Sequence, residues 1–131
     1  MPVADASVLV EYLIDGPGAV EAAHGLHGDG EEVWAPHVID AEVGHAIRGH
    51  AASGRLSASE GLIALEGMAA LPLERAGHLP FLSRAWELRQ NLSFYDALYV
   101  ALAEELEMPL VTFDRRLARA PGVRATIELL G

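Results

Sequence analysis

Short apolar segments alternate with longer stretches of helical periodicity along the whole chain, and this alternation constrains the fold more than any other feature. Strands are expected at residues 3–4, 32–35, 71–75, 110–112 and 124–127. Helices are expected at residues 6–14, 19–26, 36–52, 57–70, 79–90 and 94–107, with a short helix from residue 115. Strands that are separated by helices pair in parallel, and the helices cross over the faces of the sheet. We therefore predict a three-layer α/β domain in which a short-stranded parallel sheet lies between helices.

Glycine, proline and serine mark the boundaries of these segments. Gly16-Pro17-Gly18 and Gly28-Asp29-Gly30 are typical of turns. Ser57 starts a capping box with Glu60, and Ser93 stands at the N-cap of the last long helix. The 131 residues contain neither an internal repeat nor a low-complexity linker, so we expect one domain that spans residues 1–131.

The composition excludes several classes of protein. With 51% hydrophobic residues and a mean hydropathy of +0.22, the chain can bury enough apolar surface to fold. Because it has no cysteine, disulfides and thiolate metal sites are excluded. No apolar run approaches the roughly 20 residues that span a bilayer, and no basic start precedes a hydrophobic stretch. We expect no membrane association and a cytoplasmic location.

Four acidic residues stand out by their positions. Asp5 and Asp114 each follow a predicted strand, so both project from the carboxyl edge of a parallel sheet, where such sheets bind ligands. Asp96 lies in the first turn of a helix that is otherwise apolar on nearly all sides. Glu42 is set into the apolar stripe of the helix from residue 36. A carboxylate in such a stripe is costly unless it is paired or binds a cation.

Each of these acids also has an ordinary structural explanation. Asp5 and Asp114 could be N-caps of the helices that follow them, and Asp96 has capping-box spacing from Ser93. Glu42 could pair with an arginine or reach solvent. Caps explain neither Glu42 nor the acid in an apolar helix, so the four residues together favour a common site.

Carboxylates without histidine or cysteine are ligands for hard cations such as Mg²⁺. Without a counter-ion, four converging carboxylates would repel one another and raise some of their pKa values. One or two metal ions at such a site would support phosphoester hydrolysis. Ser7 and Thr112 each lie two residues from an aspartate. Their hydroxyls could hold a carboxylate or a metal-bound water, or could make turn hydrogen bonds.

Four segments carry these residues: DAS at 5–7, IDAEV at 39–43, YDALYVALA at 95–103 and LVTFD at 110–114. In order, spacing and total length they resemble the PIN-domain ribonucleases, specifically the VapC toxins of bacterial toxin–antitoxin pairs. Any one segment is a weak signal, but four in order on a short chain are specific. The resemblance covers essentially the whole chain.

The resemblance implies a PIN-like three-layer fold and endonucleolytic cleavage of RNA that depends on Mg²⁺ or Mn²⁺. It assigns metal binding and catalysis to Asp5, Glu42, Asp96 and Asp114. Thr112 matches the accompanying hydroxyl position of the family, and Ser7 is a looser match. The resemblance also implies inhibition by a small VapB-type antitoxin, whose C-terminal segment covers the acidic groove, and assembly into a homodimer.

The charge distribution bears on an RNA substrate. Nineteen acidic residues against nine basic residues, all arginine, give a net charge of −10. Residues 1–47 hold nine acids and no arginine, a region that could attract a basic antitoxin tail. Arg115, Arg116 and Arg119 follow Asp114 and are candidate phosphate contacts, or they form a solvated helix surface. Metal ions at the acids would partly neutralise the charge where a phosphate must bind.

Other readings remain open. A catalytically silent binding module could keep the PIN-like fold. Among other acidic-site phosphohydrolases and phosphoacceptors, receiver domains use a lysine that this chain lacks, and dehalogenase-type phosphatases want an aspartate where Ser7 stands. His37, Asp40 and His45 supply only part of a zinc site. Trp34 and Trp86 fit core or interface positions better than base stacking.

Overall fold

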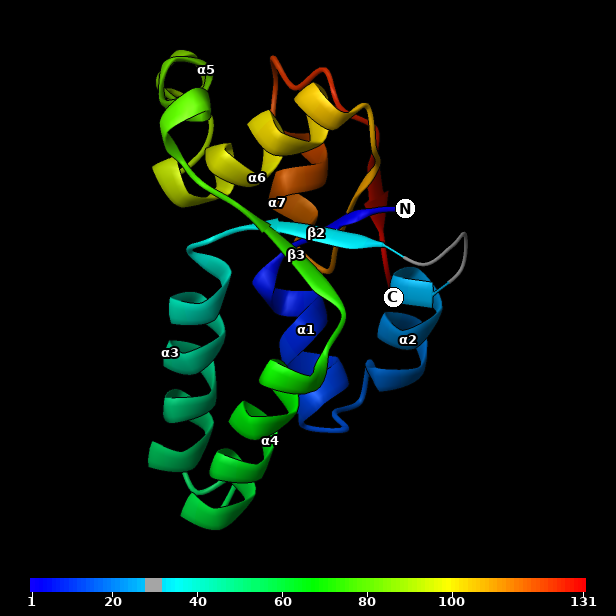
Figure 1. Cartoon of the computed structure of the whole chain (residues 1–131), viewed down its shortest axis with the longest axis vertical. Helices are drawn as coiled ribbons and strands as arrows, with labels where there is room; N and C mark the ends of the chain where they lie inside the picture. The colour runs from blue at the N-terminus through cyan, green and yellow to red at the C-terminus, as the bar shows by residue number, and fades with distance from the viewer. Residues whose placement is uncertain (28–31) are drawn as a thin grey trace.

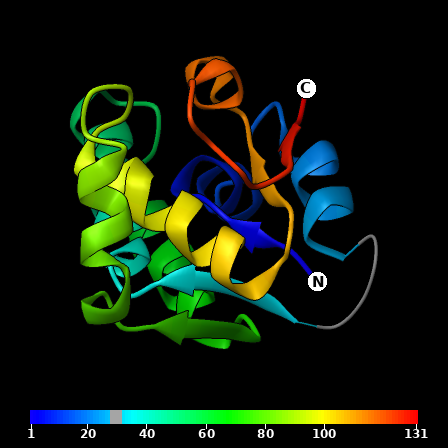
Figure 2. The same cartoon turned by 90° about the horizontal axis from the view of Figure 1, so that it is seen from above.

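The computed structural model describes residues 1–27 and 32–131, and Figures 1 and 2 show it from two directions. Five parallel strands form one sheet in the order β3-β2-β1-β4-β5. The strands are β1 (Val3–Ala4), β2 (Val33–Pro36), β3 (Leu73–Ala76), β4 (Leu110–Thr112) and β5 (Ile127–Leu129). The predicted parallel α/β sheet is therefore confirmed. The turn predicted at Gly28–Gly30 lies outside the described residues.

Helices cover both faces of this sheet. They are α1 (Ala6–Leu13), α2 (Ala19–His27), α3 (Ile39–Ala52), α4 (Ala58–Ala70), the 3₁₀ turn η1 (Leu79–Phe81), α5 (Leu82–Glu87), α6 (Phe94–Leu106) and α7 (Arg115–Arg119). Figure 1 shows α5 and α6 above the sheet and α1, α3 and α4 below it, which are the three layers that the sequence predicts. No described helix is long and apolar enough to cross a membrane.

The core is built around β1 and α6. Both residues of β1 are fully buried, as expected of a central strand in a parallel sheet that is covered on both faces. Helix α6 packs across β1, β2 and β4, and its residues 97–103 are all buried. Figure 2 shows α6 in front of the sheet. The apolar sequence of α6 is thus explained, and Asp96 lies immediately before its buried run.

The start of α3 differs from the prediction. Pro36 was expected to open the helix, but it ends β2, where it pairs in register with Ala76 of β3. The helix begins at Ile39 without a cap from its own side chains, and the backbone N–H of Val38 donates to Nε2 of His78 at 3.0 Å. Because this acceptor comes from a residue 40 positions away, no local signal in the sequence marks the start of α3.

Three other boundaries also differ. The helix predicted at 79–90 is a 3₁₀ turn containing Pro80 followed by α5, which ends at Glu87. Strand β3 starts at Leu73 instead of residue 71, and β5 covers 127–129 instead of 124–127. The caps are as predicted: Ser57 and Glu60 form a reciprocal capping box, and Ser93 caps α6. Boundaries with a local signal were therefore predicted better than those without one.

Candidate active site

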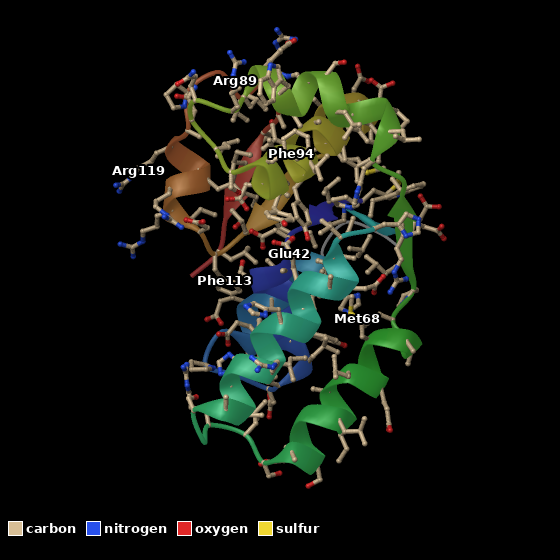
Figure 3. All side chains as sticks on the ribbon, turned by 90° about the vertical axis from the view of Figure 1, so that its left-hand side faces the viewer. Glu42, Met68, Arg89, Phe94, Phe113 and Arg119 are labelled. Carbon is tan, nitrogen blue, oxygen red and sulfur yellow. The ribbon has the colours of Figure 1, made fainter. Side chains whose placement is uncertain are left out.

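The four acids lie around the carboxyl edge of the central strands. Asp5 directly follows β1 and Asp114 follows β4 after one residue, and these two strands are paired neighbours in the sheet. Glu42 and Asp96 lie in the first turns of α3 and α6. Figure 3 shows Glu42 at the top of α3, between Phe94 of α6 and Phe113 after β4. The fold thus brings together residues that are far apart in the sequence.

Asp5 is held by two hydroxyls. Ser7 Oγ donates to Oδ1 at 2.5 Å, and Thr112 Oγ1 donates to Oδ2 at 2.5 Å. Each hydroxyl in turn accepts a backbone N–H: Ser7 from Phe113 at 3.1 Å and Thr112 from Asp114 at 2.9 Å. Of the roles considered for Ser7 and Thr112, the structure supports holding a carboxylate. Two consecutive backbone amides therefore fix the orientation of Asp5.

Asp5 also caps α1, since its Oδ1 accepts the N–H of Val8 at 3.4 Å. Only 6% of the residue is exposed. Burial raises the pKa of its carboxyl to about 6, against hydrogen bonds that lower the pKa, and the charge of Asp96 raises it further. Desolvation therefore dominates, and a cation beside Asp5 would favour its ionised form.

Glu42 has one strong partner that the sequence reasoning missed. The Tyr99 hydroxyl donates to Glu42 Oε1 at 2.7 Å. Burial raises the pKa of Glu42, the bond from Tyr99 lowers it, and the charge of Asp96 raises it. Tyr99 lies three residues after Asp96 on α6, a spacing that places both on one side of the helix. That spacing, with a phenol in an apolar run, is the signal that could have found Tyr99.

The side chains of Asp96 and Asp114 are more exposed than that of Asp5. The Ser93 hydroxyl accepts the N–H of Asp96 at 3.1 Å, as predicted for the cap of α6. No described residue donates a hydrogen bond to the Asp96 carboxylate, so capping explains Ser93 but not the acid at position 96. Burial raises the pKa of Asp96, and so does the charge of Asp114. Asp114 caps α7 by accepting the N–H of Arg116 at 2.8 Å, and its Oδ1 lies 3.6 Å from Arg116 Nε.

The electrostatics join the four acids through Asp96. Its charge raises the pKa of both Asp5 and Glu42, and Asp114 acts on Asp96 in the same way. Within the described residues, however, no three histidine, aspartate or glutamate side chains already surround one point closely enough to hold a metal ion. The donor set still fits Mg²⁺ or Mn²⁺, because these ions prefer carboxylate oxygens and Mg²⁺ usually keeps several waters in place of protein ligands.

Comparison with known proteins agrees with this geometry. The family model for the PIN domain matches residues 3–123. Ribonuclease VapC1 of Mycobacterium tuberculosis is 41% identical over 129 residues, which cover 98% of this chain and 96% of the relative. Ribonuclease VapC12 of the same organism is 42% identical over 130 residues, 99% of each chain. The chain belongs to the PIN-domain family of VapC proteins.

Solved structures support the PIN fold as well. A toxin–antitoxin complex from Klebsiella pneumoniae matches with a TM-score of 0.72 at 17% identity, over 98% of this chain and 97% of the other. At that identity the likeness concerns the fold alone. The PIN-like fold predicted from the four sequence segments is therefore confirmed.

Outside the acids, the PIN domain places the other predicted residues as follows. Arg115, Arg116 and Arg119 are exposed on α7, and Arg119 points away from the body of the molecule in Figure 3. Exposure of all three is compatible both with phosphate contact and with a solvated helix surface. Asp40 does not face Glu42: its carboxylate accepts two bonds from Arg75, at 2.7 and 2.8 Å. Asp40 is thus engaged in an ion pair within the chain.

The tryptophans differ from each other. Trp34 is half-buried and packs against the core. Trp86 is 59% exposed on α5, so of the two predicted positions the core is excluded for it and an interface position stays a prediction. The guanidinium of Arg89 lies 4.6 Å from the centre of its ring, which shields part of the apolar surface.

Proposed function

We propose that this chain is a VapC-type endoribonuclease toxin that hydrolyses RNA phosphodiester bonds with a divalent metal held by Asp5, Glu42, Asp96 and Asp114. The observation that carries the proposal is the group of four acids at one sheet edge, in which the charge of Asp96 acts on Asp5 and Glu42 and the charge of Asp114 acts on Asp96. The names of VapC1 and VapC12 as ribonucleases support the same activity.

The metal is Mg²⁺, with Mn²⁺ as an alternative. When bound, it supplies a water of lowered pKa and positive charge at the reacting phosphate. Asp5 is suited to serve as a metal ligand of fixed orientation, because its two oxygens are oriented by Ser7 and Thr112. Asp96 offers a carboxylate to which no described residue donates a hydrogen bond, so its oxygens are open to a cation.

The residues of this chain also have to bring a polyanion to an acidic surface. The exposed arginines of α7 begin directly after Asp114, so they lie next to the site and supply positive charge for the RNA backbone. Arg116 already lies 3.6 Å from Asp114, and a phosphate could share its guanidinium. We therefore assign RNA phosphate contact to Arg115, Arg116 and Arg119.

We also propose two protein partners. A small VapB-type antitoxin would inhibit the enzyme, as the VapC relatives and the Klebsiella toxin–antitoxin complex suggest. Its basic segment would be attracted by the nine acids of residues 1–47 and by the site acids. A second copy of this chain completes the expected homodimer.

Cleavage of end-labelled RNA by the purified protein tests the proposed reaction. We expect structured or single-stranded RNA to be cut in Mg²⁺, cutting to stop in EDTA, and excess Mg²⁺ to restore it. Mg²⁺ should also raise the melting temperature of the metal-free protein, because it binds the folded state. Cleavage that persists in the chelator would contradict the metal mechanism, and RNA that binds without being cut would favour a silent binding module.

Charge reversal on α7 tests the RNA surface. Arg115→Glu with Arg116→Glu should weaken RNA binding and lower the slope of log K against log salt by about one for each lost phosphate contact. Arg48→Glu with Arg55→Glu is the matched control, because it changes the net charge equally at another place in the chain. An α7 variant with the slope of the wild type would place the RNA elsewhere.

A further inference from the structure

Helix α6 brings a second functional group to the site besides Asp96. One turn further along the helix, the Tyr99 hydroxyl donates to Glu42 Oε1 at 2.7 Å and so joins residues that are 57 positions apart. Only 1% of Tyr99 is exposed, because its ring lies in the buried run of α6. A phenol that is packed so tightly carries its hydroxyl at a fixed place.

Glu42 needs such a support more than the other acids do. It lies in the first turn of α3, a helix that has no side-chain N-cap. Among the hydrogen bonds of the described residues, the Tyr99 hydroxyl is the partner of its Oε1, and no donor is found for its Oε2. A glutamate side chain with several free torsions loses considerable entropy when a ligand fixes it. The bond from Tyr99 removes part of that cost in advance.

A purely structural role does not account for the hydroxyl. Phenylalanine would fill the same space in the apolar run of α6 without needing an acceptor. The phenol finds its acceptor on an acid of the site, although the rest of the buried run of α6 is made of apolar side chains. The hydroxyl is therefore matched to Glu42 and not to the core.

We propose that Tyr99 is a positioning residue, which holds one oxygen of Glu42 and thereby presents the other oxygen to the divalent cation. The inference rests on the proposed function, since it gives Tyr99 a part in binding the metal. Tyr99 itself touches neither metal nor RNA in this scheme and acts through Glu42.

Mn²⁺ binding without RNA, followed by electron paramagnetic resonance of free Mn²⁺, tests this inference in a double-mutant cycle. Tyr99→Phe should weaken binding about tenfold, the loss typical of removing a residue that orients a metal ligand. In the Glu42→Gln background the same substitution should change affinity by less than about twofold, because the carboxylate that Tyr99 positions for the cation is already gone. Tyr12→Phe is the matched control: it removes a hydroxyl from a ring that stacks edge-on against His27.

A second measurement separates positioning from damage to the fold. If Tyr99 positions a metal ligand, excess Mg²⁺ should restore most of the cleavage rate of Tyr99→Phe, which a merely structural defect would not allow. Wild-type Mn²⁺ affinity in a folded Tyr99→Phe protein would overturn the inference. A loss of about tenfold in Mn²⁺ affinity on adding Tyr99→Phe to Glu42→Gln would overturn it as well. Absence of Mn²⁺ binding by the wild type would instead overturn the proposed function, and the role of Tyr99 with it.

Discussion

Asp5 and Glu42 belong to one group of acids, yet the molecule holds them in different ways. Asp5 is buried at the end of a central strand, and both of its oxygens accept hydroxyls that are themselves fixed by backbone amides. Glu42 is half-buried on a helix, and one side chain from the opposite layer holds one of its oxygens. Asp5 is thus part of the sheet edge, whereas the position of Glu42 depends on the contact between two helices.

The difference suggests a division of labour between the two acids. In the proposed metal site, Asp5 would provide a fixed reference point for the cation, at the cost of burying a carboxylate. Glu42, held at one oxygen by Tyr99, would offer its other oxygen to the cation. Substitutions on each side should therefore differ in size and in kind.

The largest effect is expected from Asp5→Asn. It removes the charge of the fixed acid, and because a catalytic metal site contributes several kcal/mol, cleavage should fall more than about a hundredfold. The fold should remain intact, because an amide keeps the shape of the side chain and can still accept a hydroxyl. Asp40→Asn is the control on cleavage, since Asp40 pairs with Arg75 and faces away from the site. Equal activity in Asp5→Asn and wild type would remove Asp5 from the mechanism.

The stability of the metal-free protein should also depend on Asp5 and on pH. The pKa of Asp5 is raised to about 6 from 3.8, so the folded state binds its proton more tightly than the unfolded chain does. This contribution is fully present below pH 4 and is lost as the pH rises through 6, which amounts to about 3 kcal/mol. The free energy of unfolding of Asp5→Asn minus that of the wild type should therefore increase from pH 4 to pH 7. Urea unfolding in the presence of EDTA measures this difference. A difference that does not change with pH would contradict the burial of a charged Asp5.

Thr112→Val should destabilise the protein by about 1–3 kcal/mol. It leaves the buried Asp5 Oδ2 and the partly buried N–H of Asp114 without their partner. Ser7→Ala is the matched comparison and should cost less, because Ser7 is partly exposed and water can replace its hydroxyl. Chemical unfolding of both variants measures the difference. A larger loss for Ser7→Ala would reverse the assigned importance of the two hydroxyls.

The smallest effect concerns the helix that carries Glu42. His78→Ala removes the acceptor of the Val38 N–H before the first turn of α3 and should cost about 1 kcal/mol. Hydrogen exchange should rise at the start of α3 more than at its end. His24→Ala on the exposed side of α2 is the control. Unchanged exchange around Val38 would show that His78 does not hold this helix start.

The same comparison explains what the sequence could predict. The positions of Asp5, Asp114 and Asp96 at the sheet edge could be predicted because strand ends and helix first turns carry local signals, and Ser7 and Thr112 lie two residues from an aspartate. The hydrogen-bond partners of Glu42, Asp40 and the Val38 N–H could not be predicted. Those bonds join residues 57, 35 and 40 positions apart, and nothing in the sequence beside one residue specifies the other.

Asp96 gives the most direct test of the central claim, because its charge raises the pKa of Asp5 and Glu42, and the charge of Asp114 raises the pKa of Asp96. The measurement is the RNA cleavage rate as a function of Mg²⁺ concentration for the wild type and Asp96→Asn, on one RNA. A single metal-dependent site predicts a wild-type rate that rises with Mg²⁺ and saturates, and no measurable cleavage by Asp96→Asn at any Mg²⁺ concentration. Wild-type rates in Asp96→Asn, or a wild-type rate independent of Mg²⁺, would contradict the account.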